Sequence, residues 1–221
     1  MFNRSMIGQI MFSEYRKKID EEIADFFESL PTRVDFDLST DSKRAVELLR
    51  DYTLRPSKRI RGSLAAFAYD YGKKSHYGAP GIKLGCALEL VQSYLLIIDD
   101  VMDKSETRRG EPTLHLLYAK EPTVWAKDDH TTAMLAVNVG LIAQHLASII
   151  VSELPAEGSI LNRISSVMHK NVLGTGFGQL DDLSQQLGQA VNEDDIIRKY
   201  LLKSSYYTYI NPLQTGLILG G

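Results

Sequence analysis

Apolar residues recur at spacings of three and four along almost the whole chain, which is the period of an amphipathic α-helix. No segment alternates apolar and polar positions as a half-buried strand does. The pattern therefore predicts an all-α protein, built as a bundle of long, mostly antiparallel helices.

Residues that start or stop helices suggest where each helix lies. The expected helices cover residues 11–30, 40–53, 57–72, 82–103, 123–154, 159–173 and 193–221. Pro31 should end the first helix, the 123–154 segment forms one helix or two, and the last helix should bend near Pro212. Residues 104–122 contain Gly110 and Pro112 and are expected to form a loop.

Composition limits the class of protein. The 221 residues are 44% hydrophobic, so we expect them to form a single helical domain with its own core. With 25 basic and 28 acidic residues the net charge is −3, which gives no general attraction for nucleic acid. The single cysteine, Cys86, excludes an internal disulfide, and no secretory signal is visible, so we expect a cytoplasmic protein. Polar residues inside the two most apolar stretches argue against stable membrane insertion.

A dense cluster of charge follows the apolar run that ends at residue 98. In a helix, Asp99 and Asp103 lie one turn apart on the same face, and their repulsion is relieved by a cation. A few carboxylates, completed by water and phosphate, are the ligands that Mg²⁺ prefers. Asp100 lies about a hundred degrees around the helix, so it would support or bridge the metal rather than bind it equally. Arg108 and Arg109 follow closely, and guanidinium groups beside a metal suit a diphosphate.

The same residues carry a family resemblance. The DDxxD spacing of the three aspartates, followed by Arg-Arg-Gly, resembles the first aspartate-rich motif of the trans-isoprenyl diphosphate synthases, or polyprenyl synthetase family. Residues 57–62 resemble that family's lysine and arginine loop, residues 178–183 its GQxxDL motif, and residues 203–207 the lysine and hydroxyl pair that follows. The resemblance implies helices around a central cavity, Mg²⁺ as the cofactor and a homodimer.

The resemblance also implies a reaction, in which an allylic diphosphate is condensed with isopentenyl diphosphate to a chain of fifteen to twenty carbons. The side chains implied in catalysis are Lys203, Gln179 and Ser204, and those implied in metal binding are Asp99, Asp100 and Asp103. The side chains implied in binding the two diphosphates are Lys58, Arg61, Gln92, Arg108 and Arg109. Tyr94 and Leu95, one turn before the aspartates, are expected to limit the length of the product.

Two departures from the family pattern stand out. The family carries a second aspartate-rich motif on a later helix, and this chain reaches Gly221 without one. We therefore expect a domain truncated at its C-terminus, and a 221-residue chain that is inactive by itself. In addition, Pro56 and Ser57 replace the glycine pair that usually precedes the lysine of residues 57–62.

Two other functions fit part of the pattern. A class I terpene cyclase shares the metal-binding carboxylates but has no need for a second diphosphate pocket around Lys58 and Arg61. A non-catalytic subunit or remnant would keep the fold and pair with an active partner. The isopentenyl pocket separates an elongating enzyme from a cyclase, and the missing second acidic motif leaves the non-catalytic alternative open.

Overall fold

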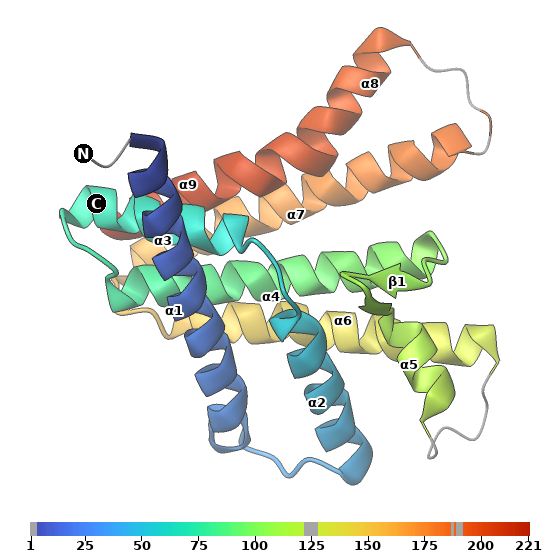
Figure 1. Cartoon of the computed structure of the whole chain (residues 1–221). Coiled ribbons are helices and arrows are strands. Elements are labelled where there is room, and N and C mark those ends of the chain that lie inside the picture. The colour runs from blue at the N-terminus through green and yellow to red at the C-terminus, as the bar shows by residue number, and fades with distance from the viewer. Residues whose placement is uncertain (1–3, 122–127, 187, 189–191) are drawn as a thin grey trace.

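Long helices make up nearly all of the computed structural model, which describes residues 4–121, 128–186, 188 and 192–221 (Figure 1). The α-helices are α1 (Arg4–Arg33), α2 (Thr40–Leu54), α3 (Ile60–Lys73), α4 (Ala79–Met102), α5 (Leu114–Lys120), α6 (Asp129–Ser152), α7 (Gly158–Gln186), α8 (Glu193–Tyr200) and α9 (Asn211–Gly220). A π-helix, η1 (Leu201–Ile210), joins α8 to α9. Within the described ranges, strands are limited to β1 (Thr107–Arg108) and β2 (Glu111–Pro112). The prediction of an all-α bundle is confirmed.

Several predicted boundaries were wrong. Helix α1 continues through Pro31 to Arg33, and α3 begins only at Ile60 because Arg59 has a left-handed backbone, with φ of 47°. The segment predicted as a loop holds a β-hairpin and helix α5. Helix α7 extends well beyond residue 173, through three glycines, to Gln186. Residues 123–127 of the predicted 123–154 helix lie outside the described residues, and α6 covers most of the rest.

Helix α4 lies at the centre of the bundle, between α3 on one side and α6 on the other (Figure 1). Its buried side chains include Leu84, Leu88, Leu90 and Ile97, none of them more than 1% exposed. By length and composition alone, both α4 and α6 could cross a membrane. However, 72% of the apolar window of α4 is buried in the protein, against 44% of that of α6. Helix α4 is therefore a core helix, whereas α6 leaves much of its apolar surface uncovered.

Glycines bring three helices unusually close together. A Cβ built on Gly62 of α3 would lie 3.0 Å from the carbonyl oxygen of Gly85 on α4, and a Cβ on Gly85 would lie 2.9 Å from the oxygen of Gly62. On the other side of α3, a Cβ on Gly216 of α9 would collide with the backbone of Ala65. Only glycine permits these backbone contacts, so α3 is packed tightly between α4 and α9.

Candidate active site

A cavity of about 280 Å³ lies between α4, α7 and η1, with one side chain contributed by α3. Eight of the side chains that the sequence analysis selected line it: Arg61, Gln92, Tyr94, Leu95, Asp99, Gln179, Lys203 and Ser204. Five of them lie outside its lining: Lys58, Asp100, Asp103, Arg108 and Arg109. The rest of the wall is largely apolar and includes Leu96, Ile98, Val172 and Leu180. The cavity thus joins charged groups to a hydrocarbon wall.

Positive and negative groups meet at Asp99. Its carboxylate lies 3.5 Å from Nζ of Lys203 and 3.4 Å from Nη2 of Arg108. Burial, followed by the charge of Asp99, raises the pKa of Asp103, which shows that the two carboxylates repel each other. This repulsion is the feature that a bound cation would relieve.

Asp100 has a different role from its two neighbours. It is 1% exposed, and its Oδ2 accepts a hydrogen bond of 2.7 Å from the hydroxyl of Tyr52. Its Oδ1 accepts from Nε of Arg108 at 2.8 Å and from Nη2 of the same residue. Because both oxygens are already used, Asp100 holds Arg108 in place, which matches a supporting role better than that of a metal ligand.

Asp99 and Asp103 fit a Mg²⁺ ion that keeps most of its other ligands as water and phosphate oxygen. In the described part of the chain, no group of three acidic, histidine or cysteine side chains could hold a metal by itself. Two carboxylates on one face of α4 therefore form an incomplete set of ligands, as Mg²⁺ sites that also bind a phosphate often have.

Helix α7 carries a second acidic group toward the same place. Asp182 accepts hydrogen bonds from Lys203 at 2.6 Å and from Lys199 at 3.0 Å. These bonds, chiefly the one from Lys203, lower the pKa of Asp182. Lys203 therefore links Asp182 on α7 with Asp99 on α4, and its ammonium borders the cavity between them.

The β-hairpin that follows α4 carries Arg108 and Arg109. Arg109 and Gly110 form its two-residue turn with φ of 57° and 83°, the left-handed pair typical of a type I′ hairpin. Arginine is unusual at such a position, because a side chain disfavours positive φ. Burial and the nearby Arg59 lower the pKa of Arg109, whose Nη1 donates a hydrogen bond of 3.3 Å to the carbonyl oxygen of Arg55. A partly buried cation at a strained position indicates a functional need for its guanidinium.

The basic residues around the start of α3 divide into two kinds. Arg59 is buried and forms ion pairs with Asp20 at 2.7 Å and with Glu89 at 3.3 Å. Among the described residues, no carboxylate lies within 4.0 Å of Lys58, Arg61 or Arg109. Arg59 therefore stabilises the fold, while the side chains of Lys58, Arg61 and Arg109 remain available to a bound anion.

Helix η1 supplies two groups that the sequence analysis missed. Tyr207 is buried and donates its hydroxyl to Oε1 of Gln92, while the guanidinium of Arg61 lies 4.1 Å from its ring centroid. Thr208 accepts a 2.7 Å hydrogen bond from Arg61. Both line the cavity with Lys203, four and five residues earlier, a spacing that the wide turn of a π-helix brings to one face.

Comparison with known proteins identifies the family of this chain. The polyprenyl synthetase family matches residues 43–221. The chain belongs to the polyprenyl synthetase family. Relatives include a farnesyl pyrophosphate synthase of Panax ginseng, 29% identical over 84% of this chain and 54% of its own length, and farnesyl pyrophosphate synthase 1 of Parthenium argentatum, 30% identical over the same shares. The chain thus spans about half the length of these relatives.

Solved structures share the fold of this polyprenyl synthetase chain. A geranylgeranyl pyrophosphate synthase from Corynebacterium glutamicum, complexed with isoprenyl diphosphate and magnesium, superposes with a TM-score of 0.84 at 21% identity, over 94% of this chain and 60% of that one. An FPP/GFPP synthase from Zymomonas mobilis gives 0.78 at 24% identity, over 96% and 70%. At these identities the likeness establishes the helical-bundle fold.

Proposed function

We propose that this chain carries the substrate sites of a short-chain isoprenyl diphosphate synthase, which joins an allylic diphosphate to isopentenyl diphosphate. The observation that carries the proposal is the cavity in which Asp99 and Lys203 adjoin an apolar wall. Charged groups there suit a diphosphate, and the apolar wall suits the hydrocarbon chain attached to it. The named activities of the relatives and the magnesium in the Corynebacterium glutamicum structure support the same reading.

The reaction needs the allylic carbon–oxygen bond to break, with its electron pair leaving on the diphosphate. Magnesium, held by Asp99 and Asp103, would supply the Lewis acid that neutralises this charge. Lys203 adds a second positive charge on the opposite wall, where Asp182 orients it. Gln179 and Ser204 border the cavity beside Lys203 and present polar groups to the developing carbocation. The apolar walls exclude water, which protects the cation from hydrolysis.

Isopentenyl diphosphate requires an anion site that does not need metal. We assign it to the unpaired cations Lys58, Arg61 and Arg109, with Gln92 next to Arg61 across the ring of Tyr207. A terpene cyclase would have no use for a second group of cations. This assignment therefore favours an elongating enzyme over a cyclase.

Calorimetric titration of the chain with each substrate tests the proposal. Geranyl diphosphate should bind only with Mg²⁺ and isopentenyl diphosphate without it. Asp103→Ala should abolish the binding of geranyl diphosphate and leave that of isopentenyl diphosphate unchanged. Lys58→Ala should weaken only the binding of isopentenyl diphosphate. Loss of both by either variant would contradict two separate sites, and binding of both with no turnover in the intact protein would identify a non-catalytic relative.

Product length forms a finer part of the proposal. Tyr94 and Leu95 line the cavity one turn before Asp99, where a growing chain would extend. Replacing Tyr94 by alanine should open space that hydrocarbon can fill, so the affinity for farnesyl diphosphate should rise relative to that for geranyl diphosphate. An unchanged ratio would place the limit on another helix.

We also propose that the protein forms a homodimer through α6. That helix has a mean hydropathy of 1.9 over its most apolar window, but only 44% of the window is buried within one chain. Met134 and Leu141 are about half exposed on it, at 47% and 49%. A second copy would cover this apolar surface. Light scattering should give twice the mass of one chain, and Leu141→Asp should reduce the measured mass to that of one chain.

A further inference from the structure

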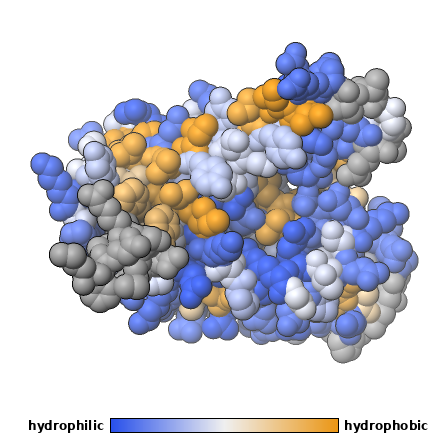
Figure 2. Space-filling view, turned by 45° about the horizontal axis from the view of Figure 1, so that its top comes forward, coloured by the Kyte–Doolittle hydropathy of each residue, from blue (hydrophilic) through white to orange (hydrophobic). Residues whose placement is uncertain are grey.

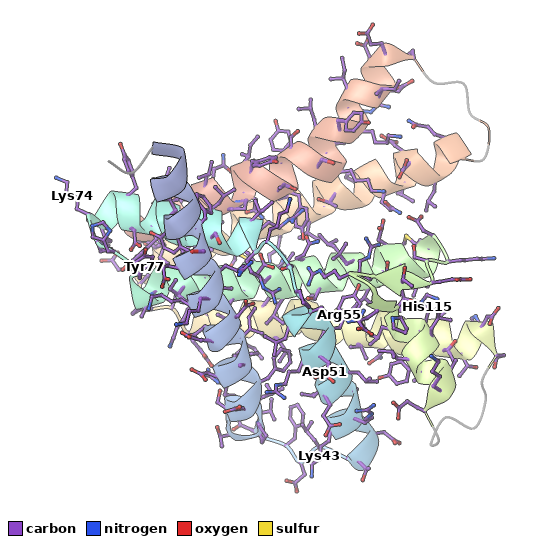
Figure 3. All side chains as sticks on the ribbon, in the orientation of Figure 1. Lys43, Asp51, Arg55, Lys74, Tyr77 and His115 are labelled. Carbon is purple, nitrogen blue, oxygen red and sulfur yellow. The ribbon has the colours of Figure 1, made fainter. Side chains whose placement is uncertain are left out.

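Arg55 connects α2 with the hairpin of β1 and β2. It directly follows the last residue of α2, is 8% exposed, and is labelled at that end of the helix in Figure 3. Its Nη1 donates to the carbonyl oxygen of Arg108 at 3.2 Å, and its Nη2 donates to that of Pro112 at 2.8 Å. Its guanidinium lies 4.8 Å from the ring centroid of Tyr52. One side chain thus holds a carbonyl on each strand of the hairpin.

These contacts close into a circuit of side chains from three elements. The hydroxyl of Tyr52, beneath Arg55, donates to Asp100 on α4. Asp100 accepts from Arg108, whose own carbonyl oxygen accepts from Arg55. Arg109 in turn donates to the carbonyl oxygen of Arg55 at 3.3 Å. The positions of the two hairpin arginines therefore depend on the end of α2.

The hairpin is short, and at its base the amide of Thr113 donates to the carbonyl oxygen of Glu106 at 3.1 Å and its hydroxyl to that of Ser105 at 2.7 Å. Each strand has two residues, and a two-stranded hairpin is at best marginally stable by itself. Its turn also contains a non-glycine residue, Arg109, with positive φ, which costs of the order of 1 kcal/mol. At the turn, Arg109 is held by its hydrogen bond to the carbonyl oxygen of Arg55, whereas the guanidinium of Arg108 is also held by Asp100.

Burying the positive charge of Arg55 at this position costs free energy. No carboxylate lies within 4.0 Å of its guanidinium among the described residues, and carbonyl oxygens and a ring surround it instead. A buried cation without a charged partner is unfavourable, so a purely structural tie would be expected to use a neutral donor. The cation thus places a positive charge beside the backbone of Arg108, next to Arg109 in the turn.

We propose that Arg55 is a positioning residue, whose guanidinium fixes the hairpin and so holds Arg109 in place to bind a diphosphate. The inference rests on the proposed function, because it assumes that Arg109 belongs to the metal-free diphosphate site. It adds that the affinity of this site is set from the end of α2, by a residue that lies outside the lining of the cavity.

Three variants test this proposal: Arg55→Met, Arg55→Lys and, as a matched control on the same helix, Arg50→Met. Arg50 lies five residues earlier, outside the circuit, 3.8 Å from Glu28. Lysine keeps the charge but lacks the planar fork by which Arg55 donates to both carbonyls, so it separates positioning from simple attraction. Hydrogen exchange by mass spectrometry follows the amides of residues 107–112, and calorimetry measures binding of inorganic diphosphate in EDTA. Urea unfolding shows that each variant is folded.

Both Arg55 variants should exchange faster than the wild type across residues 107–112 and should bind diphosphate roughly tenfold more weakly, the scale of one charged hydrogen bond. Arg50→Met should change neither. Wild-type affinity in Arg55→Lys would overturn positioning in favour of charge alone. Unchanged exchange in both variants would overturn this inference but not the proposed function. Failure of the wild type to bind diphosphate would contradict the proposed function itself.

Discussion

Carboxylates lie at both ends of α4, but in opposite electrostatic surroundings. At the amino end, Asp70 of α3 accepts hydrogen bonds from the hydroxyls of Tyr15 and Ser75 and from the amides of Tyr77 and Gly78, at 2.6 to 3.0 Å. Burial would raise the pKa of Asp70, but these bonds outweigh it and lower the pKa. The positive end of the helix dipole also favours an anion there.

At the carboxyl end, Asp99 and Asp103 face the negative end of the same dipole. Burial and mutual repulsion raise the pKa of Asp103, and the cations beside Asp99 are shared with Asp100 and Asp182. The comparison teaches that a carboxylate built for stability has all of its donors supplied by the fold. A carboxylate built for binding lacks part of its neutralising charge until a ligand arrives.

Removing the stabilising carboxylate should have the largest effect on the fold. Asp70→Ala leaves the buried hydroxyl of Tyr15 and three other donors without their acceptor, so the free energy of unfolding should fall by about 3 kcal/mol. Urea unfolding followed by circular dichroism measures it. Glu14→Ala, an exposed change on the same helix as Tyr15, should stay within about 0.5 kcal/mol. A loss as small as the control's would show that Asp70 is dispensable.

Removing a carboxylate that serves binding should weaken ligand binding and leave the stability of the fold almost unchanged. Asp99→Asn should weaken Mg²⁺-dependent binding of geranyl diphosphate by at least about tenfold, because a metal ligand is lost. The free energy of unfolding should hardly change, since Lys203 retains Asp182 as a partner. Calorimetry and urea unfolding on one preparation check both. A variant that unfolds readily but still binds would reverse the roles assigned to the two ends.

The pH dependence of stability should come from the amino end. Because the pKa of Asp70 is lower in the folded state, its contribution is present above its usual value near 3.8 and is lost as the pH falls through the folded value. Urea unfolding between pH 6 and pH 2.5 should show a steep loss below about pH 4 in the wild type. Asp70→Asn should show a shallower loss. Equal slopes would assign acid sensitivity to other carboxylates.

The smallest expected effect is a gain in the free energy of unfolding. The pKa of Asp103 is raised in the folded state, so its ionised form opposes folding at neutral pH and stops doing so at acid pH, when the carboxyl is protonated in both states. Asp103→Asn should therefore raise the free energy of unfolding by about 0.3–1 kcal/mol at pH 7 in EDTA. The gain should vanish at pH 3. A loss at pH 7 would show that Asp103 already has a stabilising partner.

Local periodicity was enough for part of this picture. The spacing of four placed Asp99 and Asp103 on one face, and the same rule placed Tyr94 and Leu95 on the wall of the cavity. The order of the motifs led to the family and thereby to the fold. Such information is contained in short stretches of the chain, so it can be read without knowing which helices are neighbours.

The rest depends on contacts between distant segments. Tyr52 takes one oxygen of Asp100 from 48 residues away, and Arg61 meets Thr208 from 147 residues away. No pattern within a short stretch of the sequence predicts either pair. The hairpin was missed because strands of two residues are too short to alternate. The end of α7 was missed because its glycines resemble a break, although packing against η1 keeps the segment helical: a Cβ on Gly178 would lie 3.0 Å from the backbone nitrogen of Lys203.

The glycine contacts of α3 have a consequence for how a substrate can enter. With Gly62 against Gly85 on one side and Gly216 against Ala65 on the other, sliding α3 along either neighbour would bring a side chain into a backbone. These three helices therefore move as one piece. Figure 2 shows two arms separated by a notch, and the arm of α7, α8 and η1 lies outside this glycine-packed group; its exposed apolar side chains include Phe177, Leu180 and Leu201. We expect the cavity to open by displacement of that arm, while Arg61 and Gln92 remain on the stationary wall.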